Sequence, residues 1–168
     1  MLTSHELLGF VSSSLANEIL DFARETDKAT YKTVVAAVAQ ARHLRPVFLE
    51  RQPRPQRHAT ILATLTRPSM EMMSGTLLRA WLVQKQKPML VDFLTSLGIE
   101  NKDGVVEDLP ATMADEKLKG AVESLLAKYP HEAVAVYLNA FNDMNEANWP
   151  NLKAMLETEP RLQFGNPA

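Results

Sequence analysis

The fold is decided by residues 68–98, which read PSMEMMSGTLLRAWLVQKQKPMLVDFLTSLG. The pattern predicts two helices, with a proline near the start of each and Gly98 as the left-handed cap of the second. In the first helix, apolar residues recur at helical spacing, and further apolar residues such as Met72 widen this apolar face until only a thin polar face remains. A helix that is apolar nearly all round is covered by neighbours on several sides. We therefore expect residues 70–86, with Trp81, to be the innermost part of the fold.

The other segments also carry helix signals. Thr3 and Glu6 have the spacing of a capping box, and Asp27 can cap a helix that begins directly after it. Asp103-Gly104 predicts a tight turn or small hairpin in the longest loop, whereas residues 139–148 are polar and resemble a turn. The fold class that follows is all-α, with about seven to nine helices in successive hairpins.

Prolines mark a period of 42 residues. Pro46, Pro88 and Pro130 are separated by this distance, and so are Pro68 and Pro110. The period implies a single helical domain, 1–160, which consists of a cap (1–25), three units (26–67, 68–109 and 110–149) and a second cap (150–160). A frayed tail, 161–168, follows the domain. One interpretation is an α-solenoid-like stack, because a single hairpin cannot bury its apolar face alone. The alternative is a compact multi-helix bundle whose prolines coincide in spacing.

Composition excludes several classes of chemistry. The 168 residues contain no cysteine, which removes disulfides, thiolate nucleophiles and cysteine-ligated zinc. The N-terminus lacks the basic region of a signal peptide. The longest unbroken apolar run, 34–39, is too short to span a bilayer. We expect a cytoplasmic protein with no membrane partner.

The segment 42–67 is strongly basic, with Glu50 as its single acid. Guanidinium groups bind phosphate or carboxylate in a bidentate manner, and Pro53 and Pro55 would hold part of the segment extended, able to follow a phosphate backbone. The candidate anion- or nucleic-acid-binding residues are Arg42, Arg45, Arg51, Arg54, Arg57, His58 and Arg67. The alternative is a solvated face, or arginines that pair with acids elsewhere in the chain.

The second half of the chain has the opposite charge. Between Glu100 and Arg161, acidic residues outnumber basic ones two to one. The molecule is therefore expected to be basic early and acidic late. Head-to-tail self-association into a homo-oligomer would follow from this asymmetry, as would simple solubility.

Catalytic patterns are weak. The four histidines have no metal-ligand spacing, and neither a nucleophile elbow, a phosphate-binding loop nor a dinucleotide motif is present. We predict no catalytic residue, metal or cofactor, and lean against an enzyme. The leading functional hypothesis is a protein- or peptide-binding or scaffold module. The second is nucleic-acid or polyanion binding through 42–67, and the third is an enzyme whose residues converge only on folding.

Overall fold

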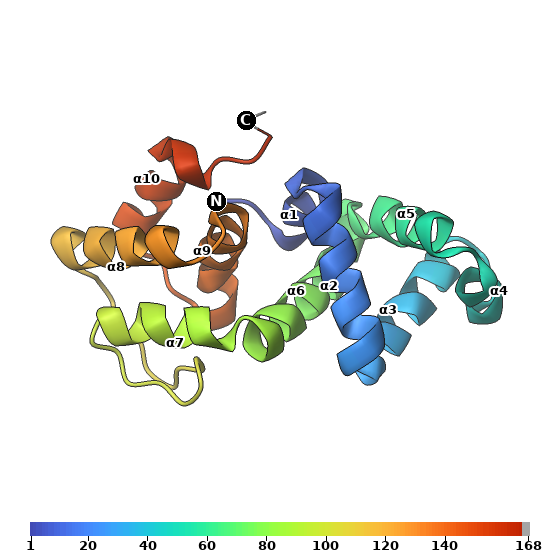
Figure 1. Ribbon diagram of the computed structural model, residues 1–168, viewed down its shortest axis with the longest axis horizontal. Coiled ribbons are helices and arrows are strands. Elements are labelled where there is room, and N and C mark those ends of the chain that lie inside the picture. Colours follow the sequence, from blue (N-terminus) through green and yellow to red (C-terminus); the bar gives the residue numbers. More distant parts are fainter. Residues whose placement is uncertain (166–168) are drawn as a thin grey trace. The chain divides into compact units, whose positions relative to one another are not determined.

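The computed structural model describes residues 1–165, and over that range the chain is all-α, as predicted (Figure 1). Within this described part there are ten α-helices and two short 3-10 helices. The only strand-like pairing there is an isolated bridge between Lys102 and Val105. The helix count slightly exceeds the expected range because the first apolar stripe is divided between two helices.

Contacts between backbone positions divide the chain into two compact units, which we describe separately. The N-terminal unit is Thr3–Trp81, and the C-terminal unit begins at Leu82 and includes Met1–Leu2. The division falls inside α6 (Glu71–Lys85), within the predicted unit 68–109. The 42-residue repeat stays a prediction.

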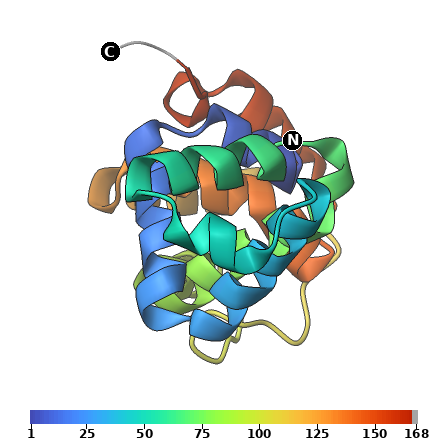
Figure 2. The same ribbon diagram turned by 90° about the vertical axis from the view of Figure 1, so that its right-hand side faces the viewer.

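The N-terminal unit is built around α3, which packs against α2, α4 and α5, while α1 packs against α5 (Figure 2). Its helices are α1 (Ser4–Phe10), α2 (Ser13–Thr26), α3 (Lys28–Ala41), α4 (Pro46–Arg51) and α5 (Arg54–Leu65), followed by the 3-10 helix η1 (Pro68–Met70) and the first part of α6.

Local side-chain caps explain where α1, α2 and α3 begin. The Thr3 amide donates to Glu6 Oε2 at 2.8 Å within the predicted capping box. Ser12 Oγ accepts from the Leu15 amide and starts α2, and Asp27 Oδ1 accepts from the Thr30 amide and starts α3. Each cap satisfies a first-turn amide that has no partner inside its own helix. The predicted start sites at residues 3 and 27 are confirmed.

A second cap on α1 comes from far along the chain. Glu71 accepts hydrogen bonds from the backbone amides of Ser4 and His5, each at 2.9 Å, and its carboxylate also meets the His5 ring. Burial raises the pKa of Glu71, but the bonds from His5 and Ser4 outweigh burial, and the net pKa lies below its ordinary value. A carboxylate at a helix N-terminus is stabilised in this way by the unpaired amides and the helix dipole.

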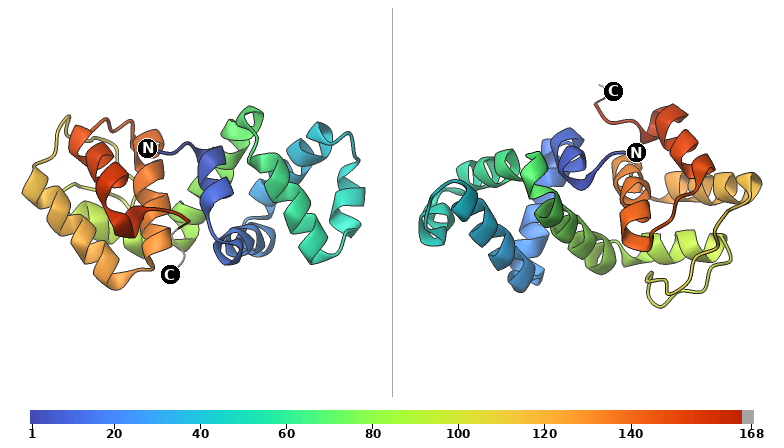
Figure 3. Two further views of the ribbon diagram at one scale, coloured as in Figure 1. Left: turned by 90° about the horizontal axis from the view of Figure 1, so that it is seen from above. Right: turned by 180° about the vertical axis from the view of Figure 1, so that it is seen from behind.

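The C-terminal unit is centred on α9, against which α8, α10 and the 3-10 helix η2 pack, while α7 packs on α8 (Figures 1 and 3). Its complete helices are α7 (Lys87–Ser96), α8 (Asp115–Lys128), α9 (His131–Asn145), α10 (Pro150–Thr158) and η2 (Pro160–Leu162). Phe93, Tyr137, Phe141 and Trp149 form its aromatic core, with centroid separations of 5.3 Å to 5.9 Å.

The most completely buried helix is α9 and not α6. Every residue from 133 to 141 is buried, whereas Met72 in α6 is 84% exposed. Met72 lies on one face with the exposed Thr76 and Arg79, at the spacing i, i+4, i+7. The expected burial of Met72 is wrong because this methionine belongs to the polar face. The expected burial of Trp81 is confirmed.

Two further predictions in this part of the chain need correction. Residues 139–148 do not form a turn, because α9 continues to Asn145. Asn139 is buried there because its Nδ2 donates to the Ala135 carbonyl at 2.8 Å and its Oδ1 accepts from the Leu2 amide at 2.9 Å. The predicted frayed tail, 161–168, starts in η2, where Leu162 is 1% exposed. Residues 166–168 lie outside the described part of the chain.

Prolines begin helices where expected. Pro46 opens α4, Pro88 lies in the first turn of α7, and Pro130 is the N-cap of α9. Pro110 instead lies in the loop that precedes α8. The first two of these helices are short, with 6 and 10 residues, but α9 has 15. The helices that begin at the three equally spaced prolines therefore differ in length.

Candidate functional site

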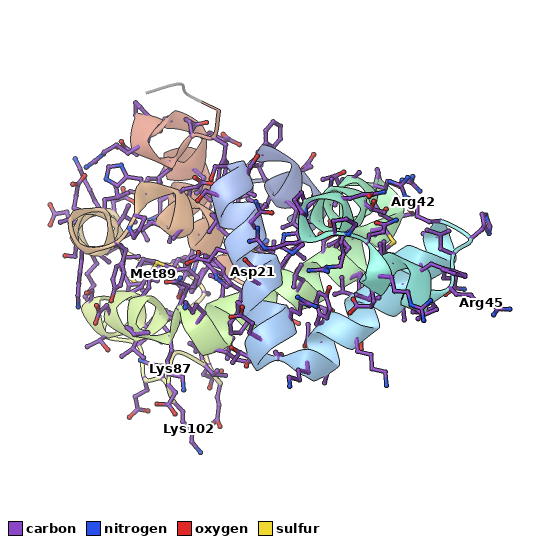
Figure 4. The ribbon with its side chains drawn as sticks, turned by 45° about the vertical axis from the view of Figure 1, so that its right-hand side comes forward. Asp21, Arg42, Arg45, Lys87, Met89 and Lys102 are labelled. Atoms are coloured by element: carbon purple, nitrogen blue, oxygen red, sulfur yellow. The ribbon has the colours of Figure 1, made fainter. Side chains whose placement is uncertain are left out.

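All seven candidate binding residues lie in the N-terminal unit, between the end of α3 and the start of η1, and Figure 4 labels two of them, Arg42 and Arg45. They do not form an extended strip. Arg54, Arg57 and His58 lie in the first turns of α5, because Pro55 occupies an early helical position where its missing amide costs nothing. The prediction that Pro53 and Pro55 keep this segment extended is wrong for residues 54–58.

Asp21 on α2 (Figure 4) gathers two of the candidates. Arg54 Nε donates to Asp21 Oδ1 at 3.2 Å, and the terminal nitrogen Nη2 of Arg54 donates to Asp21 Oδ2. This bidentate pair lowers the pKa of Asp21 and raises the pKa of Arg54. His58 Nε2 lies 3.5 Å from Asp21 Oδ1, and His58 Nδ1 lies 2.9 Å from the Asn17 side-chain oxygen. Arg54 is therefore already paired with a carboxylate of its own unit.

His58 and Arg57 are interior residues. His58 is 2% exposed, and burial lowers its pKa although the Asp21 charge acts in the opposite direction. Arg57 is 4% exposed and donates from one terminal nitrogen to the Gln52 carbonyl at 3.3 Å. Burial, and after it Glu50, raises the pKa of Tyr31 to about 12, and the nearby guanidinium of Arg57 acts in the opposite direction. Neither His58 nor Arg57 is placed to reach an external phosphate backbone.

The other four candidates are distributed along the surface. Arg42 is half-buried, and its Nε donates to Thr64 Oγ1 at 2.8 Å. Arg45, Arg51 and Arg67 are exposed. The structure brings Arg45 and Arg51 to the two ends of one short helix, α4, while Arg67 lies beyond α5. Of the seven candidates, this leaves Arg45 and Arg51 as a pair that shares a surface element.

An apolar surface accompanies this pair. We define the α4 patch as Leu44, Arg45, Val47, Phe48 and Arg51. Its three apolar side chains are 39%, 46% and 54% exposed in chain order, which is high for residues of this type. Leu49, which lies in α4 next to Phe48, points inward and is fully buried.

The backbone at the end of α3 places Leu44 in this patch. His43 adopts the left-handed conformation with φ 55°. The His43 amide donates to the Gln40 carbonyl at 3.2 Å, and the Leu44 amide donates to the Ala39 carbonyl at 2.8 Å. These are the two bonds of a Schellman motif. The α4 patch is therefore held at both its start and its centre.

The C-terminal unit presents a second surface in the loop after α7. We define the acidic hollow as Glu100, Asn101, Lys102, Val105, Glu107 and Asp108, which line an open depression of about 460 Å³. Val105 is 43% exposed. Carboxylates outnumber amines three to one among the lining residues, so the hollow favours cationic groups.

A tight turn fixes the shape of the hollow. Lys102 and Val105 exchange backbone hydrogen bonds of 2.8 Å and 3.0 Å across Asp103 and Gly104, which both have positive φ. The Asn101 side-chain oxygen accepts from the Gly104 amide at 3.0 Å. The predicted turn at Asp103-Gly104 is confirmed. Figure 3 shows the loop beside α7, and Figure 4 labels Lys102 within it.

Sequence reasoning missed both surfaces as units. The sequence analysis does not single out Phe48, although Val47 and Phe48 follow each other in a helix too short to bury both. The hollow was missed because its acids are separated in sequence by the turn. The available signal was the group Glu100, Asp103, Glu107 and Asp108 around a turn motif.

Among residues 1–165, no three or more histidine and carboxylate side chains gather closely enough to hold a metal ion. In the same range, no helix combines the length and apolarity that crossing a bilayer requires.

Comparison with models of protein families, with characterised proteins and with solved structures finds no match. The function is therefore argued from the residues of this chain.

Proposed function

We propose that the protein is a protein- or peptide-binding module and that the α4 patch binds a partner segment that is both acidic and apolar. The observation that carries the proposal is the exposure of Val47 and Phe48 on a helix with an arginine next to each end. Large apolar side chains flanked by arginine are typical of protein-binding surfaces, where aromatic residues and arginine are enriched.

The exposed apolar side chains of the patch would supply part of the binding free energy. Burying a whole Phe or Val side chain stabilises a complex by roughly 1.5–3 kcal/mol. About half of each side chain remains to be buried, so together they contribute roughly 1.5–3 kcal/mol. Arg45 and Arg51 favour a partner with carboxylates, although Glu50, which is exposed on the same helix, offsets part of their charge.

Nucleic-acid binding is the second candidate. Arg45, Arg51 and Arg67 are the candidate residues that remain exposed without a described carboxylate partner. Phosphate contacts dominate nucleic-acid affinity, and the apolar part of the α4 patch contributes nothing to them. Protein binding uses all the exposed side chains of the patch, whereas phosphate binding uses only the arginines. An enzyme remains the third candidate, and the cytoplasm remains the expected location of a chain without cysteine.

The test is a selection of binders from a random peptide library on the immobilised protein. We expect enriched sequences that combine Asp or Glu with large apolar residues, and binding that is lost in Phe48→Asp. Phe10→Asp is the matched control, because Phe10 and Phe48 are 55% and 54% exposed. Equal loss of binding in both variants, or no enrichment of acidic apolar sequences, would contradict the proposal.

A second measurement distinguishes nucleic-acid binding from peptide binding. The protein is titrated with a fluorescent single-stranded oligonucleotide and with a duplex at two salt concentrations. Binding that falls steeply with salt and disappears in Arg45→Ala with Arg51→Ala, but survives in Phe48→Asp, would favour phosphate binding. The peptide-binding proposal predicts no such oligonucleotide binding.

A further inference from the structure

We infer that the segment bound by the α4 patch is the acidic hollow of a second copy of this chain, so that copies associate head to tail. This inference rests on the proposed function of the α4 patch and names its partner.

Charge complementarity is the first argument. The α4 patch contributes Arg45 and Arg51, and the acidic hollow contributes Glu100, Glu107 and Asp108. Each surface also carries one residue of the opposite sign, Glu50 beside the patch and Lys102 in the hollow. Opposed potentials of this kind steer encounter and fix the register of docking, with an effect that weakens as salt rises.

Shape and apolarity agree with this pairing. The hollow of about 460 Å³ is open and has the exposed Val105 on its wall. Pockets of this size hold small ligands or a few protein side chains. Phe48 is 54% exposed on α4 and lies between the two arginines in sequence, so it can enter the hollow while the arginines meet its acidic rim. Phe48 then contacts Val105, and neither apolar side chain remains in water.

Both surfaces are formed before they meet. Leu49, which is fully buried, and Pro46 at the first position of α4 hold the patch. The hollow is held by the Asn101 side chain and by the close approach of Gly104 to Leu90 of α7. Binding between preformed surfaces avoids most of the cost of ordering loops and side chains.

The symmetry of such a contact has a structural consequence. The patch and the hollow are different surfaces, so the interface is heterologous and each bound copy still offers one unused patch or hollow. Heterologous contacts form rings if the rotation closes and open chains if it does not. Association should therefore continue past the dimer as the protein concentration rises.

Sedimentation velocity of the full chain over a range of concentrations tests the inference. The first variant, Arg45→Glu with Arg51→Glu, gives a copy whose patch and hollow are both acidic. The second, Glu107→Lys with Asp108→Lys, gives a copy in which both are basic. We expect the wild type to associate, each variant alone to be monomeric, and an equimolar mixture of the two to associate again. The control is Lys28→Glu with Lys32→Glu, the same charge change at exposed positions of α3, which should associate like the wild type.

Each contrary outcome overturns the inference. These outcomes are a monomeric wild type, a charge-reversed variant that still associates, a control that dissociates equally, or a mixture that stays monomeric. The two proposals can fail separately. If the wild type is monomeric but selected peptides still bind in a manner lost in Phe48→Asp, the patch binds another partner and only the self-association is wrong. If neither association nor peptide binding is seen, the proposed function fails as well.

Discussion

Replacing Gly104 by alanine should destabilise the C-terminal unit. Gly104 is buried in the turn of the acidic hollow and has φ +85°. An added Cβ would lie 2.7 Å from Leu90 Cβ, an atom fixed to the backbone of α7. Non-bonded carbon atoms do not approach one another so closely, so either the turn or α7 must move.

Two effects determine how much Gly104→Ala lowers the free energy of unfolding. Holding an alanine in the left-handed region costs roughly 1–2 kcal/mol. Relieving an overlap in a packed site costs typically about 1–3 kcal/mol. These effects sum to roughly 2–5 kcal/mol, less if the turn shifts away from α7 as a whole.

The assay is urea unfolding followed by circular dichroism, with Gly120→Ala as the matched control. Gly120 is exposed inside α8, and a Cβ there would meet nothing within 4 Å. No neighbouring atom therefore requires a glycine at this position of α8. Alanine should stabilise α8 by roughly 0.5–1 kcal/mol because it restricts the unfolded chain and favours helix.

The comparison is decisive because Gly104→Ala should lower the free energy of unfolding and Gly120→Ala should raise it. If Gly104→Ala changes the free energy of unfolding by less than about 0.5 kcal/mol, the size of an ordinary surface substitution, the turn does not lie against α7 as described. A loss in both variants of the same size would indicate that glycine content, and not the contact with Leu90, governs stability.

Three further predictions concern the two cores and the surface of α6. Burial keeps the pKa of His58 below its ordinary value in the folded state, so the unfolded state binds more protons below about pH 6.5 and stability should fall as pH drops from there through the folded pKa. His58→Asn should remove that part of the pH dependence in thermal unfolding measured at several pH values, and an unchanged profile would contradict it. Phe93→Ala should cost about 3–5 kcal/mol in urea unfolding because it leaves a cavity beside the rings of Tyr137 and Phe141, and a loss under about 1 kcal/mol would show that the cluster is not a packed core. Met72→Ala should change stability by less than about 0.5 kcal/mol, whereas Met70→Ala, at a buried position, should cost about 2 kcal/mol or more by the same assay; equal effects would refute the assigned faces.

Helices and their caps were predictable because their signals are local. The capping box of Thr3 and Glu6, the cap at Asp27 and the left-handed Gly98 each depend on residues only a few positions apart. The Asp103-Gly104 turn is local in the same sense. These features need no knowledge of what packs against them.

Burial was less predictable because it depends on which neighbour covers each face. Met72 is apolar, but it shares an exposed face with Thr76 and Arg79. The residue type alone does not tell whether Met72 lies on that face or on the buried face with Leu78. Asn139 appeared to favour a turn, although its side chain is satisfied by partners four and 137 positions away. A distant partner leaves no trace in a local pattern.

The candidate site shows the same limit. The sequence located the basic segment but could not divide it into interior and exterior arginines. Arg57 is buried and Arg54 is paired with Asp21, 33 positions earlier, while Arg45 and Arg51 stay outside. The division depends on α2 lying against α5, which is a tertiary contact.

The carboxylate of Glu71 has a consequence for the order of events during biosynthesis. Its two bonds to the amides of Ser4 and His5 span 67 and 66 positions, so α1 lacks this partner until residue 71 has left the ribosome. A fragment that stops at residue 65 should show faster amide exchange at these two positions than the intact chain. Helix α1 is thus synthesised well before the residue that completes its cap.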